Sequence, residues 1–481
     1  MPAAAEYLRV GPEIILTITG TLIMFLEAVL AESQKRILAW LAAAGLVGAL
    51  WATFNAYSDP GPAFQNMLII DGFGTFFRVV VIGVGLLAVL CSAGYLRRER
   101  ANAGEYYALI LFSIVGQSLM ATANELIMVF IGIEISSIAS YVLAGYLRDD
   151  RRNNESALKY FLLGSFATAF LLYGIAWIYG VTGSTNLTEI HRALTSPGAE
   201  PSVALTGTAA ALLLVGFGFK VSAAPFQVWA PDVYQGAPAP VAAFLSTGPK
   251  AAAFAVLIRT FLTGFSPLAS RWEPFVWASA LATMIVGNFA ALQQTNIKRL
   301  LAYSSIAHAG YVLIAVTAHS EIGSAAAMFY LASYALMQIG AFAVVTQLAG
   351  EHEKFVSVDD FAGLAQRQPG MAALLTIFLL SLIGVPLTGG FFGKFYVFKA
   401  ALDANLVWLT VLGLLNSAVA AYYYLRILVV MYFKEPGEAA IEVKPAGAAL
   451  KIALYSSAIG TLLLGIFPGS VLDFANRAAI K

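Results

Sequence analysis

The chain has 481 residues, of which 59% are hydrophobic and 11% are charged, and its net charge is +1 at pH 7. A soluble protein of this length needs far more charge on its surface, so the composition excludes a soluble globular fold and predicts an integral membrane protein. The near-neutral charge and the lack of a Lys/Arg-rich stripe exclude nucleic-acid binding.

Fourteen apolar segments are long enough to cross a bilayer as helices. None shows the period-two alternation of a transmembrane strand. We therefore predict an all-α integral membrane protein with fourteen transmembrane helices. The segments lie at 11–30, 36–54, 74–95, 105–122, 124–146, 156–180, 205–229, 240–263, 273–292, 300–318, 322–348, 371–401, 404–433 and 451–469.

Two short sequence matches predict an internal repeat. "SSIASYVLAGY" starts at Ser136 and "SSIAHAGYVL" at Ser304, while "GFGFK" ends at Lys220 and "GFFGK" at Lys394. Both offsets span five helices, and an odd number turns the second copy over in the membrane, so helices 4–8 and 9–13 are predicted to be inverted repeats. The expected organisation is a single membrane domain: three helices in 1–104, repeat one in 105–264, repeat two in 273–434, and a last helix in 435–481.

Proline and glycine inside apolar segments predict that helices 7 and 12 are broken. A proline in a helix interior loses one backbone hydrogen bond and clashes with the carbonyl four residues earlier. The carbonyls freed in this way must find protein or water partners. The alternative explanation of these prolines and glycines is a kink that only serves helix packing. The prolines are Pro225, Pro249 and Pro386, and the freed carbonyls are those of Val221, Leu245 and Leu382.

Four charged residues lie deep in apolar segments: Glu134, Lys220, Lys250 and Lys394. A charge at the centre of a membrane helix costs about 2.5–3.5 kcal/mol on insertion scales, which predicts a function for each. One reading is a structural ion pair between Glu134 and Lys220. Three lysines for one carboxylate favour a proton or ion path instead.

Two further residues are candidates for the same path. Lys159 lies four residues into the sixth segment, where a role in the path and a side chain reaching the membrane surface are both open. His308 lies within the repeat and is either a satisfied core histidine or a proton carrier.

A buried lysine suits proton transfer because burial disfavours the charged amine, which can then release its proton near neutral pH. A carboxylate about 7 Å away stabilises the charged amine by ~2.4 kcal/mol at an effective dielectric constant of ~20. Moving that negative charge closer would favour the protonated lysine, and moving it away would favour release of the proton. We therefore expect Glu134 and Lys220 to act as a gate, and Lys250, His308 and Lys394 to carry protons.

The residue inventory predicts no redox centre and no cofactor in this chain. Cys91 is the only cysteine, which excludes disulfides, iron–sulfur clusters and zinc fingers. "GFFGKF" lacks the first glycine and the Ser/Thr of a phosphate loop.

Lysine and arginine are concentrated in alternate connections between the segments, and this bias predicts that both termini face away from the cytoplasm. We count 14 in the odd-numbered connections, including Lys444, against 5 in the even-numbered connections and termini, including Lys481. The first segment is expected to act as an uncleaved signal anchor.

The sequence resembles the antiporter-like membrane subunits of NADH–quinone oxidoreductase (respiratory complex I), which are also related to multi-subunit cation/proton antiporters. The likeness covers nearly the whole chain. Its most specific stretches are "KVSAAPFQVWAPDVYQGAPAPVAAFLSTGPK" at 220–250 and "NIKRLLAYSSIAHAGY" at 296–311. The charged motif residues of this family match Glu134, Lys220, Lys250 and Lys394.

Within the family, a lysine at 394 and fourteen segments resemble the N-type subunits, because M-type subunits typically carry a glutamate there and L-type subunits have a long lateral helix. One departure is Gln227, where the family often has a histidine. An amide cannot carry a proton as a titrating group.

The resemblance implies proton translocation driven by NADH oxidation and quinone reduction in other subunits. Flavin, iron–sulfur clusters, NADH and quinone are expected in those subunits, and the implied partners are the membrane and peripheral-arm subunits of the complex, including neighbouring antiporter-like subunits. The implied location is the bacterial inner membrane. The alternatives are a subunit of a Na⁺/H⁺ antiporter or membrane-bound hydrogenase, and a passive membrane scaffold.

Overall fold

A computed structural model describes residues 4–101, 103–196, 202–436 and 445–480, and these residues confirm the predicted all-α fold class. The only strands in these ranges are β1 (Gly61–Ala63) and β2 (Leu68–Ile70), which pair antiparallel with Gly61 opposite Ile70. The α-helices are α1 Ala4–Arg9, α2 Gly11–Val29, α3 Ile37–Tyr57, α4 Gly72–Arg98, α5 Gly104–Thr122, α6 Leu126–Ala144, α7 Arg151–Thr182, α8 Leu187–Thr195, α9 Val203–Val221, α10 Trp229–Gly236, α11 Ala239–Leu245, α12 Gly248–Arg259, α13 Ala269–Leu292, α14 Ile297–Thr317, α15 Glu321–Leu348, α16 Leu364–Arg367, α17 Pro369–Ile383, α18 Gly389–Asp403, α19 Val407–Phe433, α20 Ala448–Ile466 and α21 Gly469–Ala478. Shorter helical turns are η1 Thr260–Gly264, η2 Ser266–Leu268, η3 Glu351–Glu353 and η4 Val358–Phe361.

Twelve helical stretches among the described residues are long and apolar enough to cross a membrane. The other two predicted segments coincide with α5 and with the pair α17 and α18, which are not among the twelve. The exact number of fourteen therefore stays a prediction. Lys444 and Lys481, which entered the charge count, lie outside the described residues.

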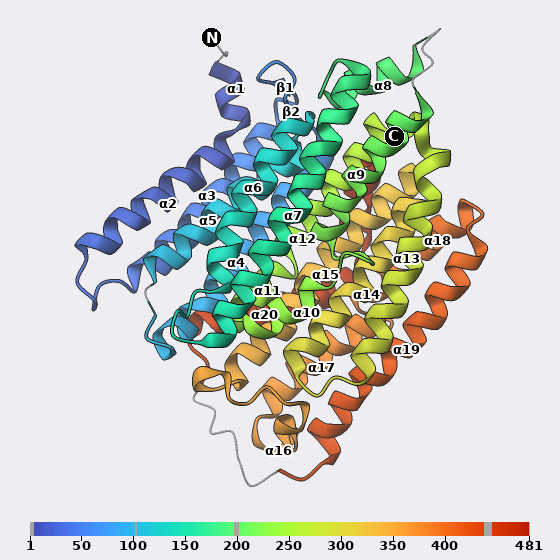
Figure 1. Cartoon of the computed structure of the whole chain (residues 1–481). Helices are drawn as coiled ribbons and strands as arrows, with labels where there is room; N and C mark the ends of the chain where they lie inside the picture. Colours follow the sequence, from blue (N-terminus) through green and yellow to red (C-terminus); the bar gives the residue numbers. More distant parts are fainter. Residues whose placement is uncertain (1–3, 102, 197–201, 437–444, 481) are drawn as a thin grey trace.

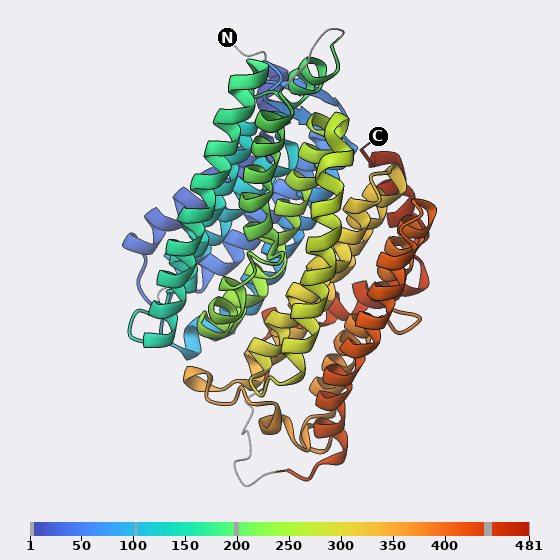
Figure 2. The same ribbon diagram turned by 45° about the vertical axis from the view of Figure 1, so that its right-hand side comes forward.

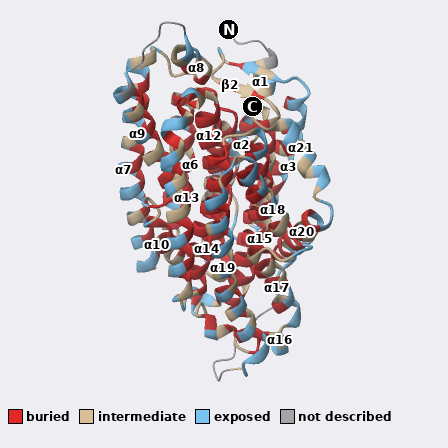
Figure 3. Cartoon of the chain, turned by 90° about the vertical axis from the view of Figure 1, so that its right-hand side faces the viewer, coloured by how far each residue is buried: buried red, intermediate tan, exposed pale blue. Residues whose placement is uncertain are grey.

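The long helices run side by side as one bundle (Figures 1 and 2). Both ends of the chain lie at the same end of this bundle, α2 and α3 at one edge and α18 and α19 at the opposite edge (Figure 1). The inner helices α12, α14 and α15 are buried almost throughout, whereas α2, α3 and α7 carry exposed apolar side chains (Figure 3). Because the outer apolar side chains suit lipid, this distribution is the one a membrane bundle requires.

Glycine allows α13 and α14 to approach closely. A Cβ atom at Gly287 would meet the backbone of Ala307 at 2.5 Å, and one at Gly310 would meet the backbone of Met284 at 2.9 Å. Small residues at such crossings let two backbones pack tightly in a membrane. The crossing holds α14 in the centre of the bundle.

The predicted breaks in helices 7 and 12 are confirmed. Helix 7 ends with α9 at Val221, where Ser222 is left-handed (φ 62°), and the chain continues through 222–228 into α10. Helix 12 is divided into α17 and α18 by 384–388, and Gly384 is left-handed (φ 94°). The inverted pairing of the two halves stays a prediction.

A third break lies in helix 8, between α11 and α12, where the sequence indicated Pro249 and a freed Leu245 carbonyl but only helices 7 and 12 were predicted to be broken. Pro249 occupies the first turn of α12, where its missing N–H has no cost, so the chain begins a new helix there. The carbonyl of Leu245 that this break frees accepts a hydrogen bond from the Tyr234 hydroxyl at 3.2 Å.

Candidate functional site

Lys220, Lys250 and Lys394 lie inside the bundle without a carboxylate partner. Among the described residues, none of them forms an ion pair, whereas the lysines that do lie elsewhere: Lys35, Lys159, Lys298, Lys399 and Lys434. Lys250 is 2% exposed and Lys394 is 6% exposed. Each of the three amines is instead bound by hydroxyl or carbonyl oxygens, which accept its hydrogen bonds without carrying a full charge.

Lys394 binds the carbonyls that the break in helix 12 frees. Its Nζ atom donates to Leu382 O at 3.1 Å, to Ile383 O at 2.7 Å and to Ser417 Oγ at 2.8 Å. The amine also lies 4.9 Å from the centre of the Tyr311 ring. The broken helix therefore supplies two acceptors of this lysine directly, and the freed carbonyls find a protein partner, which is one of the two outcomes expected from the sequence.

Lys220 lies at the end of α9 against α6. Its Nζ atom donates to Ser137 Oγ at 2.6 Å and faces the ring of Tyr141 at 5.6 Å. Glu134 lies one turn before Ser137 on the same face of α6, and its buried Oε1 atom has no hydrogen-bond partner. The structural ion pair between Glu134 and Lys220 does not form. The amine of Lys220 donates a hydrogen bond to Ser137 instead.

Lys250 of α12 binds α14 one turn before His308. Lys250 Nζ donates to Ser305 Oγ at 2.5 Å and to Ser305 O at 2.9 Å. One turn further, His308 Nδ1 lies 2.7 Å from the Tyr330 hydroxyl and Nε2 lies 3.2 Å from the Tyr424 hydroxyl. His308 is therefore a fully hydrogen-bonded histidine in contact with two hydroxyl groups.

A row of polar side chains on α14 lies between two of the lysines. Ser305, His308 and Tyr311 follow one another at intervals of three residues, from the amine of Lys250 to the amine of Lys394. The helical rise places Ser305 and Tyr311 about 9 Å apart along the axis. We call these three residues the α14 row.

Lys220 and Lys250 are joined less directly. A cavity of about 20 Å³ beside Lys220 is lined by Ser137, Lys220, Leu245 and Pro249, among others, and Pro249 is the residue before Lys250. This volume is large enough for one water molecule, which the polar groups on the cavity wall would bind. The structure thus brings both lysines to the vicinity of the break in helix 8, without a hydrogen bond between them.

Lys159 lies apart from this path. Its Nζ atom forms ion pairs with Glu155 and Asp232, each at 2.7 Å, and its side chain is 41% exposed. Asp232 also pairs with Arg299 at 2.7 Å. The structure places Lys159 in a charged cluster at one end of the bundle.

Sequence reasoning missed the neutral partners of the lysines. Serine and tyrosine are common in apolar helices, so nothing in the sequence alone singles them out. Spacing gave a weak signal, because Ser305 and Tyr311 lie three residues on either side of His308. The missed residues are Ser137, Tyr141, Ser305, Tyr311, Tyr330, Ser417 and Tyr424.

The geometry supports proton transfer among neutral and charged nitrogen and oxygen groups. A hydroxyl donates and accepts at once, and an imidazole exchanges a proton between its two nitrogens. Within the described ranges, no group of three or more His, Cys, Asp or Glu side chains is placed to hold a metal ion.

Comparisons with known proteins place the chain in a family. Residues 123–420 match the family described as NADH:quinone oxidoreductase/Mrp antiporter, transmembrane. The NADH-quinone oxidoreductase subunit N 1 of Solibacter usitatus is 64% identical over 98% of this chain and 97% of its own length. The subunit N of Trichlorobacter lovleyi is 46% identical over 97% of this chain and 96% of its own length.

A solved structure agrees with these relatives. A chain of respiratory complex I from Thermus thermophilus with bound aureothin matches with a TM-score of 0.82 at 35% identity, covering 97% of this chain and 100% of that chain. This chain therefore belongs to the NADH:quinone oxidoreductase/Mrp antiporter family of membrane proteins, among relatives that are N subunits of NADH-quinone oxidoreductase.

Proposed function

We propose that this chain translocates protons across the membrane as a subunit of NADH–quinone oxidoreductase. Redox chemistry in other subunits would supply the energy. The N-subunit relatives support the assignment to this complex. The observation that carries the proton-transfer role is the α14 row, whose first member accepts a hydrogen bond from Lys250 and whose last member faces the amine of Lys394.

The proposed path has three parts. Lys220 takes up a proton beside Ser137 and Glu134, and the charge on Glu134 controls whether the amine stays loaded. A water molecule in the cavity at the break in helix 8, which Lys220 and Pro249 line, would pass the proton toward Lys250. The proton then passes through Ser305 and His308 toward Lys394.

Lys159 has a proposed place outside the buried path. Its cluster with Asp232 and Arg299 is half-exposed, so it would exchange protons with water at that end of the bundle.

The partners and the location belong to the same proposal. Flavin, iron–sulfur clusters, NADH and quinone would be bound by other subunits, and this chain would hold no cofactor. We further propose the bacterial inner membrane, with both termini outside. Basic residues in the connections at the other end of the bundle, such as Arg100, Arg148 and Arg151, support this orientation.

A second candidate is a subunit of a multi-subunit Na⁺/H⁺ antiporter, or of a related membrane-bound hydrogenase. The description of the family supports this second candidate, because the family includes Mrp antiporters. A passive scaffold is less compatible with three lysines inside the bundle that form no ion pair among the described residues.

Purification of the tagged chain from native membranes tests the assignment. Mass spectrometry identifies the chains that come with it, and NADH oxidation is assayed on the same sample. Flavin and iron–sulfur subunits with NADH activity are expected. Antiporter-like membrane chains alone, without redox activity, would move the protein to the cation-antiporter class.

A further inference from the structure

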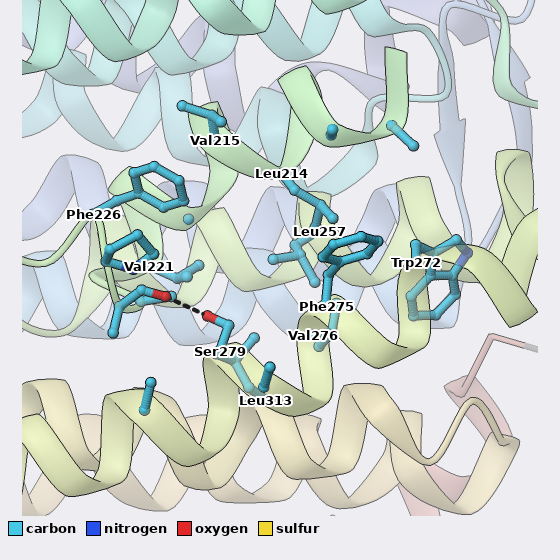
Figure 4. Close-up of a pocket in the computed structure, with 18 of the residues that line it drawn as sticks. Leu214, Val215, Val221, Phe226, Leu257, Trp272, Phe275, Val276, Ser279 and Leu313 are labelled. Atoms are coloured by element: carbon cyan, nitrogen blue, oxygen red, sulfur yellow. Dashed lines mark hydrogen bonds between the residues drawn. The ribbon is translucent and has the colours of Figure 1, made fainter. Parts of the chain in front are cut away.

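A long apolar groove lies on the side of the bundle between α9 and α13. Its volume is about 820 Å³, and Leu214, Phe275 and Val276 are among the apolar side chains on its wall. Figure 4 shows these side chains facing one another across the groove. Phe275 is 70% exposed and Val228 is 62% exposed, so the groove opens sideways to the surroundings of the bundle.

An arginine marks one end of the groove. Arg271 is the third residue of α13, is exposed and lines the groove. Its hydrogen-bond partner is the neutral Thr206 hydroxyl at 3.5 Å. No described carboxylate forms an ion pair with it, so its positive charge is available to an anion at the membrane surface.

The other end of the groove reaches the break in helix 7. Ser279 Oγ donates to Ala224 O at 2.7 Å, and Ala224 N donates to Thr283 Oγ1 at 2.8 Å. These bonds fix the break against the middle of α13, and Pro225 and Phe226 form the groove wall there.

The length of the groove matches one leaflet of a bilayer. Arg271 and Thr283 are twelve residues apart on α13, which is about 18 Å along the helix. Half of a hydrocarbon core of ~30 Å is ~15 Å. A molecule with its charged group at Arg271 would therefore reach the break in helix 7 with an acyl chain.

We propose that this groove binds an anionic phospholipid, with its phosphate at Arg271 and an acyl chain against the break in helix 7. The exposed guanidinium of Arg271 is complementary to the phosphate, and the apolar side chains of the groove are complementary to the acyl chain. The acyl chain would pack on Val221, the residue after Lys220, and would hold the break in place. This site goes beyond the proposed proton path and does not depend on it.

Photolabelling of the intact complex in native membrane vesicles tests the site. The probes are phosphatidylglycerol and phosphatidylethanolamine, each with a diazirine on the acyl chain. We expect phosphatidylglycerol to label peptides that cover 221–228 and 271–286 more strongly. Arg271→Gln should lower this labelling about fivefold, which is the effect of one basic side chain near the surface.

Two variants separate binding from folding. Arg192→Gln removes an exposed arginine of α8, which is anchored beside η1 by the contact of His191 with Thr263 O and does not line the groove, and it should leave the labelling unchanged. Ala278→Phe fills the groove from its exposed side and should abolish labelling in an assembled complex.

Three outcomes would overturn the proposal. Equal labelling by both lipids that Arg271→Gln does not change indicates bulk lipid only. Labelling that survives Ala278→Phe places the lipid elsewhere. Cross-links from the groove to another subunit, without lipid labelling, show that a protein covers this face.

Discussion

Lys220, Lys250 and Lys394 are each held by oxygens that carry no full charge. Lys394 shows the consequence most clearly, because its amine satisfies the carbonyls of Leu382 and Ile383. An unsatisfied buried polar group costs about 1–3 kcal/mol. The residue that we propose to carry a proton is thus also a structural part of its helix break.

We predict that Lys394→Ala lowers NADH-driven proton pumping and destabilises the subunit. The two carbonyls lose their donor, and the expected cost is about 1–3 kcal/mol for each. Fluorescence quenching in inverted vesicles measures pumping, and thermal unfolding of the purified complex measures stability. Lys399→Ala is the matched control, because that lysine lies on the same helix and its side chain is 49% exposed. Normal pumping by an assembled Lys394→Ala complex would exclude Lys394 from the path.

His308→Leu should reduce pumping while the complex still assembles. Leucine fills the site but contacts Tyr330 and Tyr424 without exchanging a proton, which interrupts the α14 row. The control is His319→Leu, which removes a histidine paired with Glu273 at the surface. Equal pumping by the two variants would contradict the path through His308.

At the scale of helices, the sequence predicted the apolar segments and the two main breaks from length, proline and glycine. Those features are local, so they can be read without knowing the fold. The break in helix 8 is different, since Pro249 shows where α12 begins but not where α11 ends. Ser137 and Ser305 could not be predicted as lysine partners, because each contact joins segments far apart in the sequence.

Gly390→Ala should destabilise the pairing of α17 with α18. A Cβ atom at this position would meet the backbone carbonyl of Ser381, which cannot rotate away. Overpacking of this kind typically costs 1–3 kcal/mol. Gly370→Ala is the control on α17, since a Cβ atom there meets nothing within 4 Å. A loss of thermal stability by both variants alike would contradict the close crossing.

At the scale of the whole molecule, ion pairs lie toward the ends of the bundle and the buried lysines between them. Arg259 of α12 binds Asp71, which caps α4, with two contacts at 2.8 and 2.9 Å. Lys298 of α14 binds Glu353 at 2.5 Å. These pairs tie segments from distant parts of the sequence together, and composition and periodicity gave no sign of either.

Loss of the Arg259–Asp71 pair should weaken the complex in a pH-dependent way. Burial raises the pKa of Asp71, but the charge and hydrogen bonds of Arg259 outweigh it, so the pKa lies below its ordinary value of 3.8. The pair therefore stabilises the fold above that pH, and its contribution is lost as the pH falls through the lowered pKa.

Arg259→Gln is expected to lower the unfolding temperature at pH 7. The cost should lie between the ~1 kcal/mol of an exposed pair and the ~3–5 kcal/mol of a fully buried one. The difference from the wild type should shrink below about pH 4. Lys434→Gln, which breaks an exposed pair with Asp359, is the control and should change little. A pH-independent difference would rule out this role for Asp71.

The three-residue spacing of the α14 row has a consequence for the shape of the protein. Successive members are about 300° apart around a helix of 3.6 residues per turn, so each step turns by about 60° in the other sense. Ser305 and Tyr311 therefore point in directions about 120° apart, one toward Lys250 and the other toward Lys394. A path that winds around a helix requires protein on more than one side of it. This is a physical reason for the burial of α14 almost all around, with its neighbours shielding every turn of the path from lipid.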